Sequence, residues 1–162
     1  MFDFLEEIEN ELDEPIRLIA VGGTALTLLD AKPSTIDADF TLPTPDYYVF
    51  KKALRNTPHG FNVDCWAEGM VFSQILPEDY LTRSTLIKKM KRIHLGALNP
   101  VDIVVSKIGR LDERDKEDIQ TCIKKFKLKK NQILERAEKI EYVGREKNYE
   151  INLDYVVKRF FG

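Results

Sequence analysis

The spacing of apolar residues divides the first half of the chain into short strands that alternate with helices. In residues 2–12 the apolar side chains recur every three or four positions, which is typical of a helix that Pro15 ends. Residues 16–21, IRLIAV, form an apolar run rich in branched side chains, which indicates a buried strand. The same two patterns predict further helices over residues 23–31 and 46–56 and further strands over residues 35–42 and 61–66.

The second half of the chain is mainly helical. VFSQIL, residues 71–76, and KRIHLGAL, residues 91–98, are typical of strands. Asn99 and Pro100 then predict the start of a helix, because Asn caps free N–H groups and Pro suits the first helical position. The remainder, to residue 161, is expected to form three or four helices.

The pattern as a whole predicts one α+β domain over residues 1–162. Residues 16–98 would form the sheet core, and residues 99–162 a helical part packed on it. With 43% apolar residues the chain is long enough to bury a real core. No repeat, low-complexity tract or linker interrupts it.

Two carboxylates share one face of the predicted strand 35–42. Side chains alternate along a strand, so Ile36 would face the core, while Asp37 and Asp39 would lie together on the opposite face. Like charges this close repel each other and raise each other's pKa unless a cation lies between them. Hard divalent ions such as Mg²⁺ prefer carboxylate oxygens. The pair therefore indicates a divalent-cation site, although a solvated strand face would show the same pattern.

Gly22 and Gly23 follow the first predicted strand, at the turn into the next helix. Glycines in this position have two explanations. The backbone there could need a positive φ or a close contact that a side chain would prevent. Alternatively, the backbone N–H groups could approach a phosphate at the start of the helix. The glycines alone leave both explanations open.

Charge and cysteine content narrow the class of protein. The 27 acidic and 25 basic side chains give a net charge of -2, which excludes a strongly basic nucleic-acid binder held by bulk charge. No segment approaches the roughly eighteen apolar residues of a membrane helix, and the acidic N-terminus is unlike a secretory signal. We expect a cytoplasmic protein without membrane contact, in which Cys65 and Cys122 are reduced and buried.

Gly22-Gly23, thirteen intervening residues and Asp37-Ala38-Asp39-Phe40 together resemble the signature of the DNA polymerase β-type nucleotidyltransferase superfamily. The resemblance implies a nucleotidyltransferase-type mixed sheet flanked by helices. It also implies that the glycine turn holds a nucleoside triphosphate and that Asp37 and Asp39 bind Mg²⁺. This superfamily usually has a third carboxylate on a following strand, for which Asp64 in the predicted strand 61–66 is the candidate.

A second resemblance lies in SKIGRLDERDKEDI, residues 106–119. Lys107, Arg110, Arg114 and Asp118 share one face if a single helix spans them, although an exposed, salt-bridged helix has the same spacing. The row resembles minimal nucleotidyltransferase-like proteins, some of which are related to the toxin nucleotidyltransferases of abortive-infection systems. This resemblance implies that Lys107 and Arg110 offset the charge of the leaving pyrophosphate.

The activity that the resemblance implies is transfer of a nucleoside monophosphate group from a nucleoside triphosphate to an acceptor hydroxyl. Two Mg²⁺ ions would lie among Asp37, Asp39 and Asp64, with Asp64 closest to the acceptor. A tRNA end, a protein hydroxyl and a small molecule such as an aminoglycoside are all open as acceptors. A homodimer and a helical partner protein are equally open.

Two alternatives belong to other classes. Asp-x-Asp also occurs in many glycosyltransferases and in haloacid-dehalogenase-type phosphatases, and Thr41, two residues after Asp39, fits the phosphatases; the chain is short for a phosphatase of this type, which would leave the glycine turn unexplained. The second alternative is a catalytically degenerate nucleotidyltransferase fold that serves as a binding module or toxin–antitoxin component. The basic runs 88–92 and 124–130 would then form an RNA-binding face, although acidic segments balance them.

Overall fold

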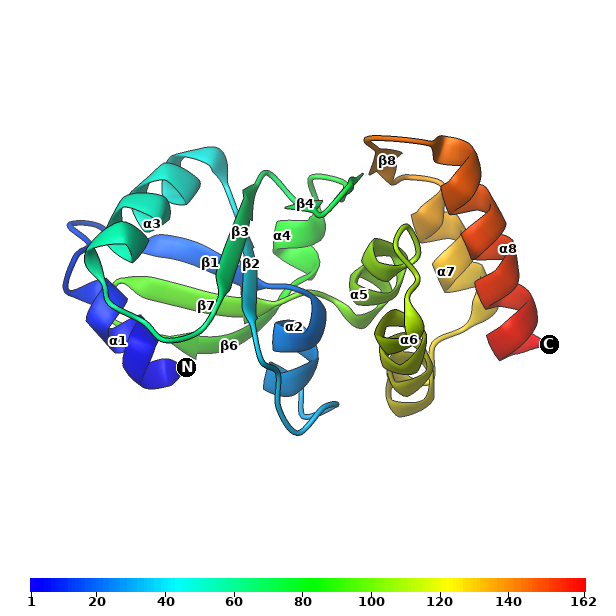
Figure 1. Cartoon of the computed structure of the whole chain (residues 1–162), viewed down its shortest axis with the longest axis horizontal. Coiled ribbons are helices and arrows are strands. Elements are labelled where there is room, and N and C mark those ends of the chain that lie inside the picture. Colours follow the sequence, from blue (N-terminus) through cyan, green and yellow to red (C-terminus); the bar gives the residue numbers. More distant parts are fainter.

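The computed structural model describes residues 1–162, which form two sheets and eight helices (Figure 1). The strands are β1 (Ile16–Ala20), β2 (Ala38–Leu42), β3 (Val63–Ala67), β4 (Met70–Val71), β5 (Gln74–Ile75), β6 (Thr85–Lys89), β7 (Ile93–Ala97) and β8 (Glu141–Tyr142). The helices are α1 (Phe2–Glu9), α2 (Gly22–Leu28), α3 (Thr44–Asn56), α4 (Tyr80–Arg83), α5 (Pro100–Lys107), α6 (Glu113–Phe126), α7 (Lys130–Ala137) and α8 (Glu146–Phe161). None of the eight helices combines the length and apolar character needed to cross a bilayer.

The larger sheet is mixed and has five strands in the order β3-β2-β1-β7-β6, whereas β4, β5 and β8 form a small second sheet. Within the larger sheet β1 pairs parallel with β7 and antiparallel with β2. Figure 1 shows this sheet with α1, α2 and α3 in one half of the molecule and α5 to α8 in the other. The predicted α+β fold with a C-terminal helical segment is confirmed. A single cluster of 35 buried apolar residues runs through both halves, from Phe4 in α1 to Val156 in α8.

The strand predicted over residues 35–42 begins later than expected. Its pairing with β3 starts at Ala38, whose N–H donates to the carbonyl of Asn62 at 3.0 Å. Ile36, expected to face the core, lies before the strand and is 82% exposed, so that part of the prediction was wrong. The partner strand β3 begins only at Val63, which pairs with Ala38, so residues 35–37 have no strand to pair with. Asp37 is therefore a loop residue at the entrance to β2.

Two features at the edges of the larger sheet also differ from expectation. β6 was not predicted, because its residues TLIKK are mostly exposed and lack a buried apolar alternation. Lysines at an edge strand disfavour pairing with another chain. At the other edge, Cys65 on β3 is only partly buried, whereas Cys122 is buried as predicted, and neither forms a disulfide.

The charged row of residues 106–119 does not lie on one continuous helix. α5 ends at Lys107, and Leu111 adopts a left-handed φ of +50°, which breaks the helix. Asp112 then caps α6: its side chain accepts from the N–H of Asp115 at 2.9 Å, and the Asp115 side chain accepts from the N–H of Asp112 at 3.3 Å. The Asp-Glu-Arg-Asp sequence contains this capping signal, which overrides the helical spacing.

The start of α5 agrees with the prediction, and its position depends on a buried ion pair. The side chain of Asn99 accepts from the N–H of Val101 at 2.9 Å. Asp102, in the first turn, is fully buried and accepts two hydrogen bonds from Arg136 on α7, at 2.5 and 3.2 Å. Arg136 also pairs with Asp79 at 2.9 Å, so α7 and the start of α4 are joined to α5 through one guanidinium.

We predict that Arg136→Met lowers the free energy of unfolding by about 3 kcal/mol, because it leaves the buried carboxylate of Asp102 with only the more distant Arg83, at 3.6 Å, as a partner. Urea denaturation would measure the loss. In the double variant Asp102→Leu/Arg136→Met the buried carboxylate and its guanidinium partner are both removed, only the more exposed Arg83 and Asp79 lose a partner, and most of the stability should return. A single variant as stable as the wild type would contradict this account.

Candidate active site

The strand directions bring three separate segments to one edge of the larger sheet, which here means the edge formed by the ends of the strands and not an outer strand. The end of β1 lies beside the start of β2, because these strands are antiparallel and Ala20 pairs with Phe40. β3 runs parallel to β2, so its start lies at the same edge. β7 runs parallel to β1, so the chain leaves β7 at this edge and enters α5. The glycine turn, the aspartates and the charged row are therefore neighbours in space, although Gly22 and Asp118 are 96 positions apart in sequence.

The glycine turn connects β1 to α2 and is fixed against β2. Gly22 has a φ of +53°, a conformation that favours glycine, which supports the steric explanation of this residue. The buried hydroxyl of Thr24 accepts from the N–H of Asp39 at 2.9 Å and donates to the carbonyl of Asp37 at 3.3 Å. No side chain caps the start of α2, so the N–H groups of Gly22 and Gly23 border the cavity without a side-chain partner.

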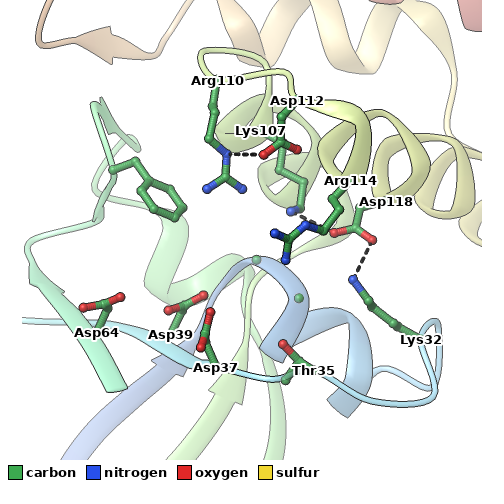
Figure 2. Close-up of a pocket in the computed structure, with 13 residues that line it drawn as sticks. Lys32, Thr35, Asp37, Asp39, Asp64, Lys107, Arg110, Asp112, Arg114 and Asp118 are labelled. Atoms are coloured by element: carbon green, nitrogen blue, oxygen red, sulfur yellow. Dashed lines mark hydrogen bonds and ion pairs between the residues drawn. The ribbon is translucent and has the colours of Figure 1, made fainter. Parts of the chain in front are cut away.

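The three predicted aspartates form a row along this edge. Asp39 and Asp64 are direct partners in the parallel pairing of β2 and β3, and Asp37 lies two residues before Asp39. Figure 2 shows the three side chains next to one another on the sheet side of one cavity. Asn62 donates to Asp64 at 2.8 Å and so orients its carboxylate. The sequence prediction therefore brought together three residues that do meet.

The negative charge of the row is only partly offset by the charges of Lys107 and Arg110. Burial, reinforced by the charges of Asp64 and Asp37, raises the pKa of Asp39 to about 6. The carboxylates are not gathered into a closed cage: no three Asp, Glu, His or Cys side chains lie close enough to hold a metal ion unaided. Their oxygens nevertheless fit a hard divalent ion in donor chemistry, and an open row leaves coordination positions for phosphate oxygens and water.

Cations form the opposite side of the cavity. Its volume is about 210 Å³, and 12 of its 13 lining residues are not hydrophobic. Figure 2 shows Lys107, Arg110 and Arg114 facing the aspartates, with Lys32 at one side. The end of α5, the break and the start of α6 together supply three of these four cations. Because the helix breaks after Lys107, the charged residues lie around the cavity and not along one face of a single helix.

Lys107 is buried and fully engaged within the chain. Its ammonium pairs with Asp115 at 3.1 Å and with Asp118 at 2.9 Å, and Asp118 also pairs with Lys32 at 3.1 Å. Arg110 donates two hydrogen bonds to Asp115, at 2.7 and 2.8 Å. Burial alone would raise the pKa of Asp115, but the hydrogen bond from Arg110 and the charge of Lys107 hold it below its usual value. Lys107 is therefore not part of an exposed salt-bridged surface.

Arg114 is the one cation of the cavity that forms no ion pair, and it is exposed. The sequence analysis placed it in the charged row but assigned it no role. Lys32, Thr35 and Phe72 were missed altogether, because they lie in loops and turns without a recognisable spacing. Only their contacts in the folded chain reveal them, such as the ion pair of Lys32 with Asp118.

The two basic runs lie in different halves of the molecule. Residues 88–92 end β6 and form the turn into β7, where Arg92 donates to the carbonyl of Leu12 beyond α1. Residues 124–130 connect α6 to α7. Figure 1 shows α1 in the half of the molecule that contains the larger sheet and α6 in the helical half. A single RNA-binding face made of both runs therefore has no support in the fold.

Comparisons with known proteins are consistent with this arrangement. The model of a family described as "Nucleotidyltransferase of unknown function (DUF6036)" matches residues 1–160. Among solved structures, the crystal structure of ANT(2″)-Ia in complex with adenylyl-2″-tobramycin is similar, with a TM-score of 0.53 at 14% identity. The similarity covers 98% of this chain and 97% of that one, and at this identity it shows the fold alone. The search of curated proteins found no match.

We predict that Asp39→Asn stabilises the metal-free protein at neutral pH. The pKa of Asp39 is raised from 3.8 to about 6, so ionisation costs the folded state stability as the pH rises through this range, and the cost persists above it. Asn cannot ionise. Its advantage in free energy of unfolding should be absent below pH 3.8 and reach about 1 kcal/mol above pH 6, after allowance for solvent screening. Denaturation at several pH values would measure it, and an advantage independent of pH would contradict the stated cause.

We predict opposite effects on stability for two cations of the same cavity. Lys107→Met should lower the free energy of unfolding by about 2–3 kcal/mol, because two buried carboxylates lose a partner while Arg110 and Lys32 still neutralise part of their charge. Arg114→Met should change it by less than about 0.5 kcal/mol, since its side chain is exposed and unpaired. Urea denaturation of both variants tests this, and equal losses would refute the assignment.

Proposed function

Because the chain belongs to the nucleotidyltransferase family DUF6036, we propose that it transfers a nucleoside monophosphate group from a nucleoside triphosphate to an acceptor hydroxyl. The observation that carries the proposal is the cavity itself, in which a row of aspartates faces a set of cations across the glycine turn. A triphosphate with bound Mg²⁺ has the complementary arrangement of charge. Its metal ions suit the carboxylates, and its phosphate oxygens suit the cations.

In this proposal Asp37, Asp39 and Asp64 hold Mg²⁺. When bound, the ions would offset the charge of the reacting phosphate and lower the pKa of the acceptor hydroxyl. Asp64 lies on the outer strand β3 and is exposed, so an acceptor can reach it from solvent. Asp39 is partly buried between the other two and is suited to contact both ions. Burial is the main cause of the raised pKa of Asp39 and repulsion from Asp64 and Asp37 adds to it; both support the proposal, because a bound cation would favour the ionised carboxylate.

The cations divide into two groups under the proposal. Lys107 and Arg110 are held by Asp115, so they give the cavity wall a fixed shape and a partly neutralised charge. Arg114 is unpaired and Lys32 is on a loop, so both can turn toward phosphate oxygens without leaving a carboxylate buried alone. We therefore assign the larger share of triphosphate affinity to Arg114. Lys107 and Arg110 contribute through the positive electrostatic potential that they create in the cavity.

The acceptor is a hydroxyl of a small molecule in the version of the proposal that we would test first. ANT(2″)-Ia was crystallised with adenylyl-2″-tobramycin, and it shares the fold over nearly its whole length. A tRNA end and a protein hydroxyl are the other candidates. The degenerate alternative, a binding module or toxin–antitoxin component without catalysis, is a second candidate, because the carboxylates do not form a closed metal cage. A homodimer or helical partner belongs to the same set of open proposals.

We predict that the wild type binds nucleoside triphosphates only when Mg²⁺ is present and that Asp37→Asn/Asp39→Asn abolishes this binding. Isothermal titration with ATP, GTP, CTP and UTP, with and without Mg²⁺, measures both effects. Removing two carboxylates takes away the metal ligands but also relieves repulsion, so the double variant should be at least as stable as the wild type.

The matched control is Asp3→Asn/Asp13→Asn, which removes two exposed carboxylates outside the cavity and changes the net charge equally. It should bind as the wild type does. If the wild type binds no triphosphate under any condition, catalysis is excluded and the degenerate alternative replaces the proposal. If the control loses binding as well, the effect comes from net charge and not from the aspartate row.

A further inference from the structure

Phe72 is the only hydrophobic residue that lines the cavity. It forms the tip of the hairpin between β4 and β5, and it is 37% exposed. All other lining residues are charged, hydroxyl-bearing or glycine. The ring packs on Trp66 and does not belong to the buried core, so core packing alone does not account for an aromatic residue at the wall of so polar a cavity.

The backbone of Phe72 is strained. Its φ is +54°, a conformation that glycine adopts freely and that a bulky residue rarely takes. Two-residue hairpin loops favour glycine at such positions. Strained residues concentrate at functional sites, where the surrounding structure holds them in place. At this turn the chain keeps an aromatic side chain at a cost in stability that glycine would avoid.

The ring is held in a fixed position. The guanidinium of Arg110 lies over it at 4.5 Å from the ring centroid, and the ring of Trp66 packs against it at 4.9 Å and 54°. The hairpin is itself fixed, because the carbonyl of Ser73 accepts from the N–H of Val143 at 2.8 Å. Phe72 is thus a rigid, partly exposed aromatic surface at the wall of the cavity.

The position of Phe72 relative to the aspartate row suggests what it binds. Trp66 lies two residues after Asp64 on β3, so both side chains share one face of that strand and the ring of Phe72 lies near the Asp64 end. Gly23 and Thr35 mark the other end, where a Cβ on Gly23 would come within 3.1 Å of the Thr35 hydroxyl. A triphosphate that runs from the glycine turn along the aspartates would direct its sugar and base toward Phe72.

We propose that Phe72 stacks against the base of the nucleoside triphosphate, which is the one flat, apolar part of that substrate. This inference rests on the proposed function, since it concerns the same cavity and the same substrate class. Stacking on an aromatic ring is tolerant of base identity, because every base has a π-face. Phe72 therefore supplies affinity for the nucleoside, while Arg114 and the aspartate row supply affinity for the metal-bound phosphates.

The test compares nucleoside triphosphates with inorganic tripolyphosphate, which has the phosphates but no base. In the presence of Mg²⁺ the wild type should bind each of ATP, GTP, CTP and UTP more tightly than tripolyphosphate. Phe72→Gly should weaken triphosphate binding by about tenfold and leave tripolyphosphate binding unchanged. Its melting temperature should not fall, because glycine relieves the positive φ. Phe72→Tyr keeps the ring and should bind as the wild type does.

Lys127→Gly is the matched control, since it relieves a φ of +51° at a residue outside the cavity and should leave both affinities unchanged. Equal binding of tripolyphosphate and triphosphates by the wild type would overturn the proposal, as would a Phe72→Gly variant with unaltered affinity for triphosphates. A loss of both affinities in Phe72→Gly would show that the ring only positions Arg110. Failure of the wild type to bind any triphosphate or tripolyphosphate would remove the proposed function and this inference together, whereas the other outcomes leave the proposed function intact.

Discussion

The pairing of Lys107 with Asp115 and Asp118 is the interaction on which the cavity depends. It joins the end of α5 to α6 across the break in the charged row, and Asp118 extends it to Lys32 on the loop before β2. Both carboxylates and the ammonium are buried, so the cost of removing any one of them is high. The pairing therefore holds the cation side of the cavity at a fixed distance from the aspartates of the sheet. The helical half is positioned as part of the site and not only as a cover for the sheet.

The same pairing limits what the cations can do. Lys107 and Arg110 already neutralise Asp115, so their attraction for a phosphate is weaker than the count of positive charges suggests. Only Arg114 faces the cavity without a carboxylate partner. Cations held by buried carboxylates lose little entropy when a ligand binds, whereas an unpaired, exposed arginine retains its full charge but must be ordered. The cavity combines both kinds of cation: Lys107 and Arg110 form a rigid wall, and Arg114 is exposed and unpaired.

The sequence predicted the parts of the site that depend on local pattern. The alternation of apolar and polar residues predicts the strand after Asp37, and the paired glycines predict the turn before α2. The capping residue Asn99 predicts the start of α5. It also predicted Asp64, whose pairing with Asp39 depends on strand order, because a motif already indicated a third carboxylate. The break at Leu111 was missed because a left-handed φ in a leucine has no sequence signal, and helical spacing outweighed the Asp-Glu-Arg-Asp cap. Phe72 and Lys32 were missed because only tertiary contacts place loop residues beside a cavity.

Three departures from the most stable local choice meet in this one cavity. Gly22 gives up a side chain in the turn, Asp39 is ionised beside two like charges, and Phe72 takes a backbone conformation that suits glycine. Many other parts of the chain follow their local preferences, with a capped α6 and a core of apolar residues at the expected spacings, although Leu111 and Lys127 also adopt a left-handed φ. Asn at position 39 and Gly at position 72 would each avoid the cost, so folding alone gives no reason for these two costs to coincide. A ligand that carries metal ions, phosphates and a flat apolar group would offset the last two at once, which supports the nucleotide site that we propose.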